Sequence, residues 1–495
     1  MSGAQLALSG RQTVSISAPT LAADTPMSRS RHEPDSPSHR RDNGAPSAPA
    51  RDTTRIALTR LQALLDPHSF QPWRTEVGDG VIAGSGRVDG RAVCVWTQDV
   101  GHRGGSLGAA GGETIVRTLA RASRCGVPVI GLPDSGGARL QEGVGALHAY
   151  AAIFREQAQT RVPQIALIGG VCAGGAAYSP ALGDFVVMIR PRGRMFLTGP
   201  KVVEQVTGEQ IDAEQLGGAR VHSANGVAHL LADDDRSAAK LLRQLLGYLP
   251  STLGGCPNRA HPTDPPEGNP ADQLPASPRS VYDVRDVIAA LSDAGTHLEL
   301  SERWARNMVT TLARVDGRPI GVMANQPWYR GGAIDSAASE KGVWFVKLCD
   351  RIGLPLVVLV DTPGFLPGTR QERDGVIRHG AALLRAFACA TTPKVTVTLR
   401  QAYGGAHIVM NSRGLGSDLT LAWPQAQIGV MGAAQAVAIT ERRAIVDGAD
   451  PAALAARYAS QCLGVASAAA RGFIDEIVNP ADTRSRLIRA LDLHS

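Results

Sequence analysis

A chain of 495 residues exceeds what one hydrophobic core usually spans, so two core-bearing domains are expected. Its hydrophobic fraction of 43% indicates a globular protein, and no apolar run is long enough to cross a bilayer, which excludes a membrane-spanning protein. The net charge of +6 is dispersed among acids without a basic stripe, which argues against nucleic acid as a partner and fits a phosphate-bearing ligand.

The cysteines and the N-terminus further limit the kinds of site and the location that are expected for this protein. Seven cysteines are scattered without any Cys-x-x-Cys pair, so neither a disulfide framework nor a zinc ribbon is expected, and no metal site is predicted. The N-terminus lacks the compact apolar core of a secretory signal, because the short apolar run at residues 4–8 is followed by polar residues. A cytoplasmic location is therefore expected.

Composition divides the chain into four segments. Residues 1–51 are rich in Ser, Pro, Ala and Arg and are expected to be disordered, because they cannot bury a core. Residues 52–255 and 281–495 each alternate short apolar runs with longer helical stretches, the pattern of parallel strands joined by crossover helices. A linker is predicted over 256–280, where prolines disfavour both helix and strand. The chain is therefore expected to contain two globular α/β regions, one on each side of the linker.

Within these two regions, periodicity predicts individual elements. Continuous apolar runs are typical of buried parallel strands and occur twice in each region, at 127–132, 164–168, 356–360 and 394–399. Helices are predicted over 141–156 and 376–388. Apolar spacings of three and four predict the buried face of the first of these helices, formed by Val144, Leu147, Ala151 and Phe154.

Three glycine-rich landmarks recur in the second region in the same order. The corresponding motifs, 227, 227 and 230 residues apart, are Gly104-Gly105-Ser106 with Gly331-Gly332-Ala333, Asp134-Ser135-Gly136 with Asp361-Thr362-Pro363-Gly364, and Ala173-Gly174-Gly175-Ala176 with Tyr403-Gly404-Gly405-Ala406. One Gly-Gly pair is weak evidence in a chain with 55 glycines, but three ordered landmarks indicate an internal duplication.

The repeated Gly-Gly turns suggest a chemistry. Each turn follows a strand and leads into a helix, where backbone N–H groups stay unpaired and can bind an anion. Consecutive amides without side chains can hold a thioester oxygen as it becomes an enolate, and a second turn can hold the urea oxygen of a carboxylated urea that gives up CO2. Two such sites predict two anionic intermediates that meet in a dry cleft.

Other interpretations of these motifs have less support. Asp361 ends a strand as in a GTPase, but the chain has no phosphate-binding Gly-x4-Gly-Lys-Ser/Thr loop. Asp134, Arg139 and Glu142 are expected to form structural ion pairs or helix caps. No Gly-x-Ser-x-Gly elbow supports a serine hydrolase, and Cys172 is expected to be a small buried thiol.

From about residue 55 to the C-terminus, a series of motifs resembles a known family. They are Leu64-Leu65-Asp66, Gly104-Gly105-Ser106-Leu107-Gly108, Asp134-Ser135-Gly136-Gly137-Ala138-Arg139, Cys172-Ala173-Gly174-Gly175-Ala176, Ala324-Asn325-Gln326-Pro327, Ser339-Glu340-Lys341, Asp361-Thr362-Pro363-Gly364-Phe365, Arg378-His379-Gly380, Ala402-Tyr403-Gly404-Gly405-Ala406 and Ala422-Trp423-Pro424. In this order they resemble the carboxyltransferase beta subunits of biotin-dependent acyl-CoA carboxylases, such as acetyl-CoA and propionyl-CoA carboxylases.

The resemblance implies two tandem crotonase-like domains related by duplication and a ring-shaped homohexamer. The active site would lie between the first half of one subunit and the second half of its neighbour, with the coenzyme A ester on the first half and biotin on the second. The matching residues are Gly174 and Gly175 for one oxyanion hole, Gly405 and Ala406 for the other, Gly136, Gly137 and Ala138 for substrate binding, and Ile408 at the acyl end of the pocket.

The expected partner is a separate alpha subunit with biotin carboxylase and biotin carboxyl carrier functions, because this chain has no Met-Lys-Met biotinylation site and no ATP-binding loop. Biotin would therefore be carried on that other subunit. The substrate stays open between acetyl-CoA and propionyl-CoA, since one methylene is worth only about 1–3 kcal/mol in an apolar pocket. Two alternatives also stay open: a biotin-dependent acyl-CoA decarboxylase and a non-catalytic assembly subunit.

Overall fold

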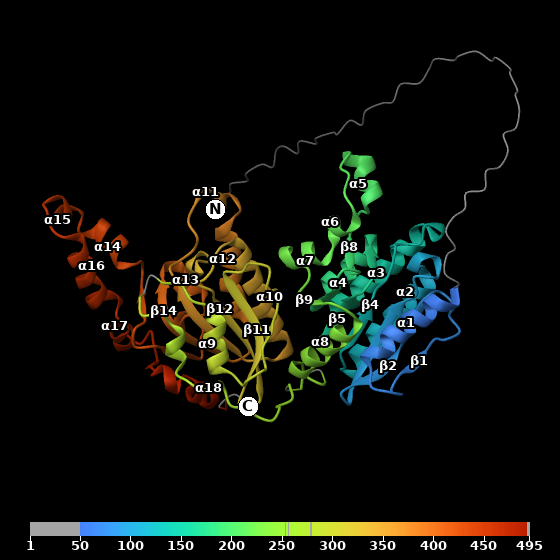
Figure 1. Ribbon diagram of the computed structural model, residues 1–495, viewed down its shortest axis with the longest axis horizontal. Helices are drawn as coiled ribbons and strands as arrows, with labels where there is room; N and C mark the ends of the chain where they lie inside the picture. The colour runs from blue at the N-terminus through green and yellow to red at the C-terminus, as the bar shows by residue number, and fades with distance from the viewer. Residues whose placement is uncertain (1–49, 253, 256, 278–279, 493–495) are drawn as a thin grey trace, which may run out of the picture. The chain divides into compact units, whose positions relative to one another are not determined.

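The computed structural model describes residues 50–252, 254–255, 257–277 and 280–492 (Figure 1). The tail predicted over 1–51 lies outside these residues, apart from the first two residues of helix α1 (Ala50–Leu64). The described part of the predicted linker contains the short 3-10 helix η4 (Pro270–Gln273). Among the described helices, none is both long and apolar enough to cross a membrane.

The first half folds around a seven-stranded sheet in the order β1-β2-β3-β4-β5-β7-β9. Strands β1 to β3 are antiparallel, and β3, β4, β5, β7 and β9 run parallel. The strands of this half are β1 (Gln71–Trp73), β2 (Val81–Val88), β3 (Arg91–Gln98), β4 (Val129–Leu132), β5 (Gln164–Ile168), β6 (Val171–Ala173), β7 (Phe185–Ile189), β8 (Arg194–Phe196) and β9 (Leu230–Ala232). The two strands predicted here are confirmed as β4 and β5.

Helices cover both faces of this sheet. Leu61 of α1 and Leu242 of α8 belong to one hydrophobic core, whereas Ile115 of α2 and Ile153 of α3 belong to another. The remaining helices of the half are α2 (Ala109–Cys125), α3 (Val144–Gln159), α4 (Tyr178–Leu182), α5 (Pro200–Thr207), α6 (Ala213–Gly217), α7 (Ala219–Asn225) and α8 (Asp235–Tyr248). The alternation of strands and helices confirms the predicted α/β class.

The second half repeats this plan around an eight-stranded sheet in the order β10-β11-β12-β13-β14-β15-β17, with β16 paired to β14. Its strands are β10 (Leu298–Glu299), β11 (Met308–Val315), β12 (Arg318–Asn325), β13 (Leu356–Thr362), β14 (Lys394–Tyr403), β15 (Leu419–Ala422), β16 (Gln427–Gly429) and β17 (Glu476–Ile477). Its helices are α9 (Val284–Leu291), α10 (Ser336–Ile352), α11 (Thr369–Arg373), α12 (Val376–Cys389), α13 (Gly404–Val409), α14 (Ala433–Thr440), α15 (Arg442–Val446), α16 (Pro451–Tyr458), α17 (Val465–Ala470) and α18 (Thr483–Asp492). Again an antiparallel pair, β11 and β12, precedes the parallel strands.

The duplicated motifs adopt the same backbone geometry. Gly105 and Gly332 have φ of 66° and 77°, in 3-10 turns that follow β3 and β12. A β-carbon on either glycine would collide with the carbonyl oxygen of Asp134 or Asp361, the duplicated residues at the ends of the next parallel strands. Only glycine fits both the dihedral angle and the close approach, which explains why this landmark occurs in both halves.

The helix predicted over 141–156 is confirmed as α3, but the predicted buried face is wrong. Val144 and Leu147 are 80% and 59% exposed. The buried residues of α3 are Ala146, Ala149, Tyr150, Ile153 and Gln157. A β-carbon on Gly112 of α2 would lie 2.6 Å from that of Ala149, so α2 and α3 approach each other at small residues. Val144 and Leu147 consequently lie on the exposed side of α3, and Tyr150 and Ile153 are the large side chains that it buries.

The two halves also contact each other. The His229 ring stacks on Trp344 of α10, with centroids 4.3 Å apart and planes 6° apart. The backbone oxygen of His229 accepts the Ser301 N–H at 2.9 Å. Arg351 of α10 forms an ion pair with Asp184 of the first half. These contacts connect the two duplicated halves through residues outside the three duplicated motifs.

Candidate functional site

Each half has a short helix that begins directly after a strand. In the first half, η3 (Gly174–Ala177) follows β6, and in the second half α13 follows β14. Their first residues, Gly174 and Gly404, have φ of 59° and 58°, a conformation that favours glycine. The N–H groups in the first turn of a helix lack intrahelical partners, so each half presents the predicted row of amides.

The first turn lies against the predicted substrate-binding loop of Gly136, Gly137 and Ala138. A β-carbon on Gly174 would be 3.8 Å from the Cα of Gly137, and one on Gly137 would be 3.1 Å from the Ala173 oxygen. Gly136 is exposed, whereas Gly137 is buried. The structure therefore brings Gly137 of this loop against the turn that contains the predicted oxyanion-hole glycines, whereas Gly136 lies near the Gly104 oxygen and Ala138 pairs with Leu107.

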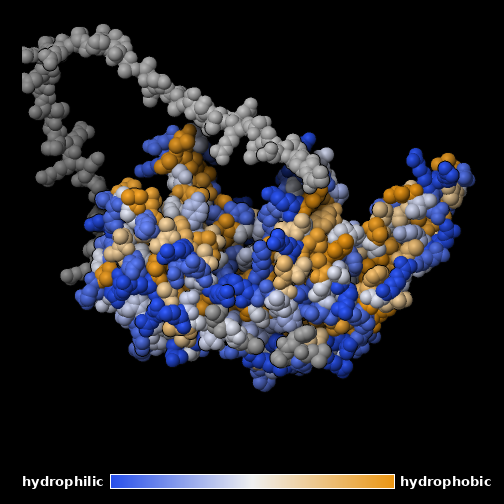
Figure 2. All heavy atoms as spheres, turned by 180° about the vertical axis from the view of Figure 1, so that it is seen from behind, coloured by the Kyte–Doolittle hydropathy of each residue, from blue (hydrophilic) through white to orange (hydrophobic). Residues whose placement is uncertain are grey.

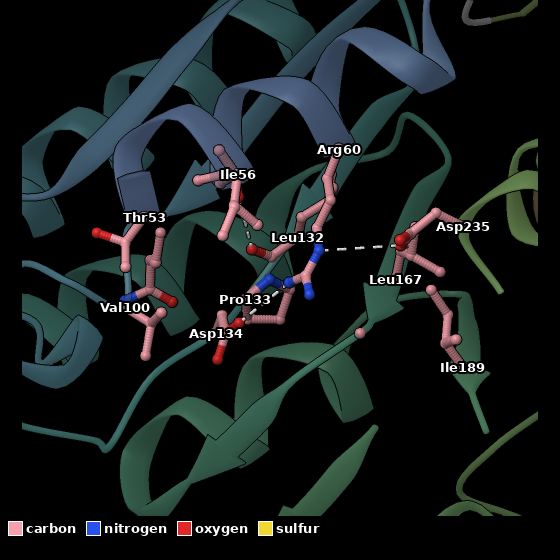
Figure 3. A pocket seen from close by; sticks show the side chains of 14 residues that line it. Thr53, Ile56, Arg60, Val100, Leu132, Pro133, Asp134, Leu167, Ile189 and Asp235 are labelled. Carbon is pink, nitrogen blue, oxygen red and sulfur yellow. Dashed lines mark hydrogen bonds and ion pairs between the residues drawn. The ribbon is translucent and has the colours of Figure 1, made fainter. Parts of the chain in front are cut away.

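Asp134 fixes the strand that precedes the first turn. Its Oδ1 accepts the Val171 N–H at 3.2 Å, and its Oδ2 pairs with Arg60 of α1 at 3.3 Å. Figure 3 shows Arg60 reaching toward both Asp134 and Asp235. Burial raises the pKa of Asp134 above its usual value, and the charge of Arg60 opposes that rise. The adjacent cavity of about 30 Å³ has room for water rather than for a substrate.

Arg139 and Glu142 form the structural ion pair expected from the sequence. Arg139 pairs with Asp79 and, between Nη1 and Oε1, with Glu142 at 2.8 Å. The Oε2 atom of Glu142 accepts the Ala109 N–H at 2.7 Å, where a carboxylate stabilises the start of α2. Both side chains thus join the loop after β4 to α2.

A cavity of about 930 Å³ opens at the second turn. Gly405 and Ile408 line it, with the Ile408 side chain 49% exposed, whereas Ala406 is buried. The lining residues are Gly404, Gly405, His407, Ile408, Ser412, Arg413, Gly414, Leu415, Ile428, Gly429, Val430, Tyr458, Cys462, Leu463, Ser467, Ala468, Arg471 and Phe473. All of them come from the second half, so the first turn does not contribute to this cavity.

Burial favours the uncharged form of two titratable groups beside the turns. Burial raises the pKa of the Cys172 thiol and lowers the pKa of His407. Cys172 is therefore a buried neutral thiol, as expected. The Nδ1 atom of His379 lies 3.1 Å from Oε1 of Glu340, which positions that ring. The backbone amides of the two turns are the groups best suited to bind a negatively charged oxygen here.

Sequence reasoning missed the aromatic rings that support the two turns. A β-carbon on Gly175 would lie 3.0 Å from the ring of Tyr150, and one on Gly405 would lie 3.5 Å from the ring of Phe365. Phe365 directly follows the duplicated Asp-Thr-Pro-Gly motif, a signal that could have identified it. Tyr150 gave no comparable signal, because it lies outside the apolar face predicted for its helix.

Comparisons with known proteins agree with this geometry. The family model of the carboxyl transferase domain matches residues 51–495. The chain is 47% identical over 474 residues to the propionyl-CoA carboxylase beta chain of Saccharopolyspora erythraea, covering 88% of this chain and 87% of that one. It is 44% identical over 456 residues to the methylmalonyl-CoA decarboxylase subunit alpha of Veillonella parvula, covering 88% and 89%.

A solved structure is also similar. Transcarboxylase 12S, described as a hexamer with methylmalonyl-coenzyme A and methylmalonic acid bound, gives a TM-score of 0.84 at 43% identity and covers 88% of this chain and 89% of that one. The chain therefore belongs to the carboxyl transferase domain family, and its two halves are tandem crotonase-like α/β domains.

Proposed function

We propose that this chain is the carboxyltransferase subunit of a biotin-dependent acyl-CoA carboxylase. It moves CO2 from carboxybiotin on a carrier protein to the α carbon of acetyl-CoA or propionyl-CoA, giving malonyl-CoA or methylmalonyl-CoA. The observation that carries the proposal is the pair of glycine turns, whose first residues have φ of 59° and 58°. The similarity to a propionyl-CoA carboxylase beta chain and to a methylmalonyl-CoA-bound transcarboxylase supports the substrate class.

In this proposal each turn stabilises one negatively charged oxygen. The amides of Gly174 and Gly175 hold the thioester oxygen while the α carbon loses its proton, with Gly136, Gly137 and Ala138 contacting the same substrate. Backbone donors aimed at a developing oxyanion contribute roughly 3–4 kcal/mol each in a site that excludes water. The amides accordingly favour the enolate over the bound thioester.

The second turn takes biotin. The amides of Gly405 and Ala406 hold the urea oxygen, and the apolar walls of the 930 Å³ cavity fit the fused rings of biotin. Biotin supplies the CO2 and the base that removes the α proton, so this chain needs no side-chain base. Ile408, which lines the cavity, contacts the acyl end of the substrate and favours short apolar acyl groups.

In this proposal the chain acts as a homohexamer. The similarity to the transcarboxylase 12S hexamer supports a homohexamer in which the first turn that completes the site belongs to a neighbouring subunit, and a cavity at the second turn lined by the second half alone is compatible with it. Apolar side chains available for such contacts are exposed on α5, at Val202 and Val206, on α14, at Ile439, and on α15, at Val446. Figure 2 shows hydrophobic surface on this face of the molecule. Carboxybiotin arrives on a biotin carboxylase and carrier alpha subunit.

Reconstitution with the partner subunit tests this proposal. Purified chain and alpha subunit, supplied with ATP and labelled bicarbonate, should transfer label to acetyl-CoA or propionyl-CoA. Failure with every short acyl-CoA and several partner subunits would contradict the proposal and favour an assembly subunit without turnover. Mass spectrometry of the chain should find no biotinylated lysine.

A second candidate is a biotin-dependent decarboxylase that removes CO2 from a malonyl-type thioester. The 44% identity to a methylmalonyl-CoA decarboxylase subunit supports this second candidate function. Both directions use the same two turns, so geometry does not separate them. Release of CO2 from methylmalonyl-CoA without ATP, together with no carboxylation when ATP is present, would favour the decarboxylase.

A further inference from the structure

A buried ion pair lies at the end of the strand that leads to the second glycine turn. Asp361 belongs to β13, and Arg400 belongs to β14, four residues before Gly404. The Arg400 Nε atom donates to Asp361 Oδ2 at 3.0 Å, and the two side chains are 12% and 2% exposed. Burial raises the pKa of Asp361, and the charge of Arg400 opposes that rise. Each charge therefore depends on the other in this buried place.

The ion pair spans an irregularity in the sheet. Val360 of β13 pairs with Thr398 of β14. The next pair of the ladder is Thr362 with Ala402, so β14 contains two more residues than β13 in this interval. Extra residues of this kind bend a strand and change the direction in which the residues after them point. Arg400 lies inside the bend, so its bond to the neighbouring strand fixes β14 just before the turn.

The same two side chains also hold the segment that precedes the second half. The Tyr282 hydroxyl donates to Asp361 Oδ2 at 2.8 Å, and Arg400 Nη1 donates to the backbone oxygen of Ser280 at 2.8 Å. Tyr282 is buried, and the Arg400 guanidinium lies 5.2 Å from the centroid of its ring. Arg400 therefore has contacts on both of its sides, and its position in the bend is fixed.

The first half pairs the duplicated aspartate with a different arginine. At the offset of 230 residues that relates the two turns, Arg400 corresponds to Gly170. The pairing of β6 with β8 and of the end of β14 with β16 agrees with this correspondence. A β-carbon on Gly170 would overlap the carboxylate of Asp134, so no side chain fits there, and Arg60 of α1 supplies the charge instead. In the second half the arginine is part of the strand that carries the turn.

We propose that Arg400 and Asp361 are positioning residues for the second glycine turn. Their bond fixes the direction in which β14 enters α13, and with it the direction of the Gly405 and Ala406 amides that hold the urea oxygen of biotin. Breaking the bond weakens the binding of biotin and leaves the binding of the coenzyme A ester at the first turn unchanged. The inference rests on the proposed function, because it assigns the pair to the biotin side of the same site.

The test is the reverse transfer in the purified protein, from methylmalonyl-CoA or malonyl-CoA to free biotin, which forms carboxybiotin and the shorter CoA ester. Arg400→Met removes the charge and keeps an unbranched side chain. The KM for biotin should rise about tenfold, the effect of one hydrogen bond to a charged group, while the KM for the CoA ester stays unchanged. Arg400→Lys, which keeps the charge, should recover part of the affinity for biotin.

The matched control is Arg60→Met, which breaks the corresponding pair in the first half. It should raise the KM for the CoA ester and leave the KM for biotin unchanged, the opposite of the result for Arg400→Met. A rise of both KM values in each variant would overturn the inference, because the two arginines would then stabilise the protein as a whole and not one turn each.

A double variant separates positioning from folding. Arg400→Met leaves the Asp361 charge buried and unpaired and should lower the melting temperature, whereas Arg400→Met with Asp361→Asn removes both charges and should restore part of it. The KM for biotin should stay raised in the double variant, since the bond to β14 is still absent. A KM for biotin equal to that of the wild type in the double variant would overturn this inference alone. A wild-type protein that transfers carboxyl groups neither to biotin nor to any acyl-CoA would instead overturn the proposed function, and this inference with it.

Discussion

The two halves of the chain share the same glycine turn and differ in the space around it. Gly174 and Gly404 begin their helices with φ of 59° and 58°, yet the first turn is enclosed by Tyr150 and the loop at Gly137, whereas the second opens into a cavity of about 930 Å³. In the proposed function, duplication has kept the backbone geometry that holds an anionic oxygen and has changed the walls that select the molecule carrying it. The following variants test whether the turns hold the oxygen while the surrounding walls select the molecule that carries it.

The largest effect is expected at Gly405. Its φ is not in the left-handed region, and a β-carbon would lie 3.5 Å from Phe365, so the backbone accepts a side chain. In Gly405→Val the branched methyl groups would obstruct the amides, and transfer should fall at least about 100-fold, the effect of losing one oxyanion donor. Gly405→Ala, which adds one carbon, should lose less. Full transfer activity in the valine variant, with an unchanged melting temperature, would refute the role of this turn.

The next effect concerns the contact between the halves. The Nδ1 atom of His229 accepts the Val186 N–H at 2.9 Å, and burial lowers the pKa of His229 from 6.5 to about 3. Between these values the unfolded chain binds a proton that the folded chain excludes, so stability should fall by roughly 1.4 kcal/mol per pH unit as pH decreases below 6.5.

The His229→Gln variant should lose this part of the acid sensitivity. Chemical denaturation at pH 7 and pH 5 measures it, and the wild type should lose about 2 kcal/mol more than the variant between the two. Equal losses of unfolding free energy in the two proteins would mean that protonation of His229 does not destabilise the contact between the halves.

A smaller effect compares the two duplicated glycines directly. Alanine at φ near 59° costs roughly 1–2 kcal/mol at either position, because the β-carbon approaches the following carbonyl group. At Gly404 a β-carbon would also lie 3.1 Å from the Val430 oxygen, whereas at Gly174 its nearest neighbour would be 3.8 Å away. Thermal denaturation should therefore show Gly404→Ala to be less stable than Gly174→Ala. The reverse order would contradict the tighter packing of the second turn.

The smallest effect is expected at Ile408, a residue of the cavity wall. Ile408→Val removes one methylene and should change the ratio of kcat/KM for propionyl-CoA to that for acetyl-CoA by about tenfold. The activity on the better substrate should stay close to that of the wild type. An unchanged ratio would remove Ile408 from the acyl-binding wall and leave it as a residue of the biotin side.

Several features of the fold and the site are predictable from local patterns. The strands β4 and β5 and the duplicated glycine turns are of this kind, since buried strands require continuous apolar runs and left-handed φ values favour glycine. The role of Cys172 as a buried thiol was also predicted correctly. By contrast, the buried face of α3 was predicted incorrectly, because the close approach of α2 at Gly112 decides which side of α3 faces inward.

By itself, the sequence determined the α/β class, the duplication, the family and the positions of the two turns, because each depends on short stretches of chain and their order. Only the tertiary structure decided which groups surround those turns. Tyr150 behind Gly175, Arg60 beside Asp134 and the cavity beyond Gly405 join residues far apart in the chain. Their contacts depend on how neighbouring elements pack, and packing distances are a property of the whole fold rather than of any local pattern.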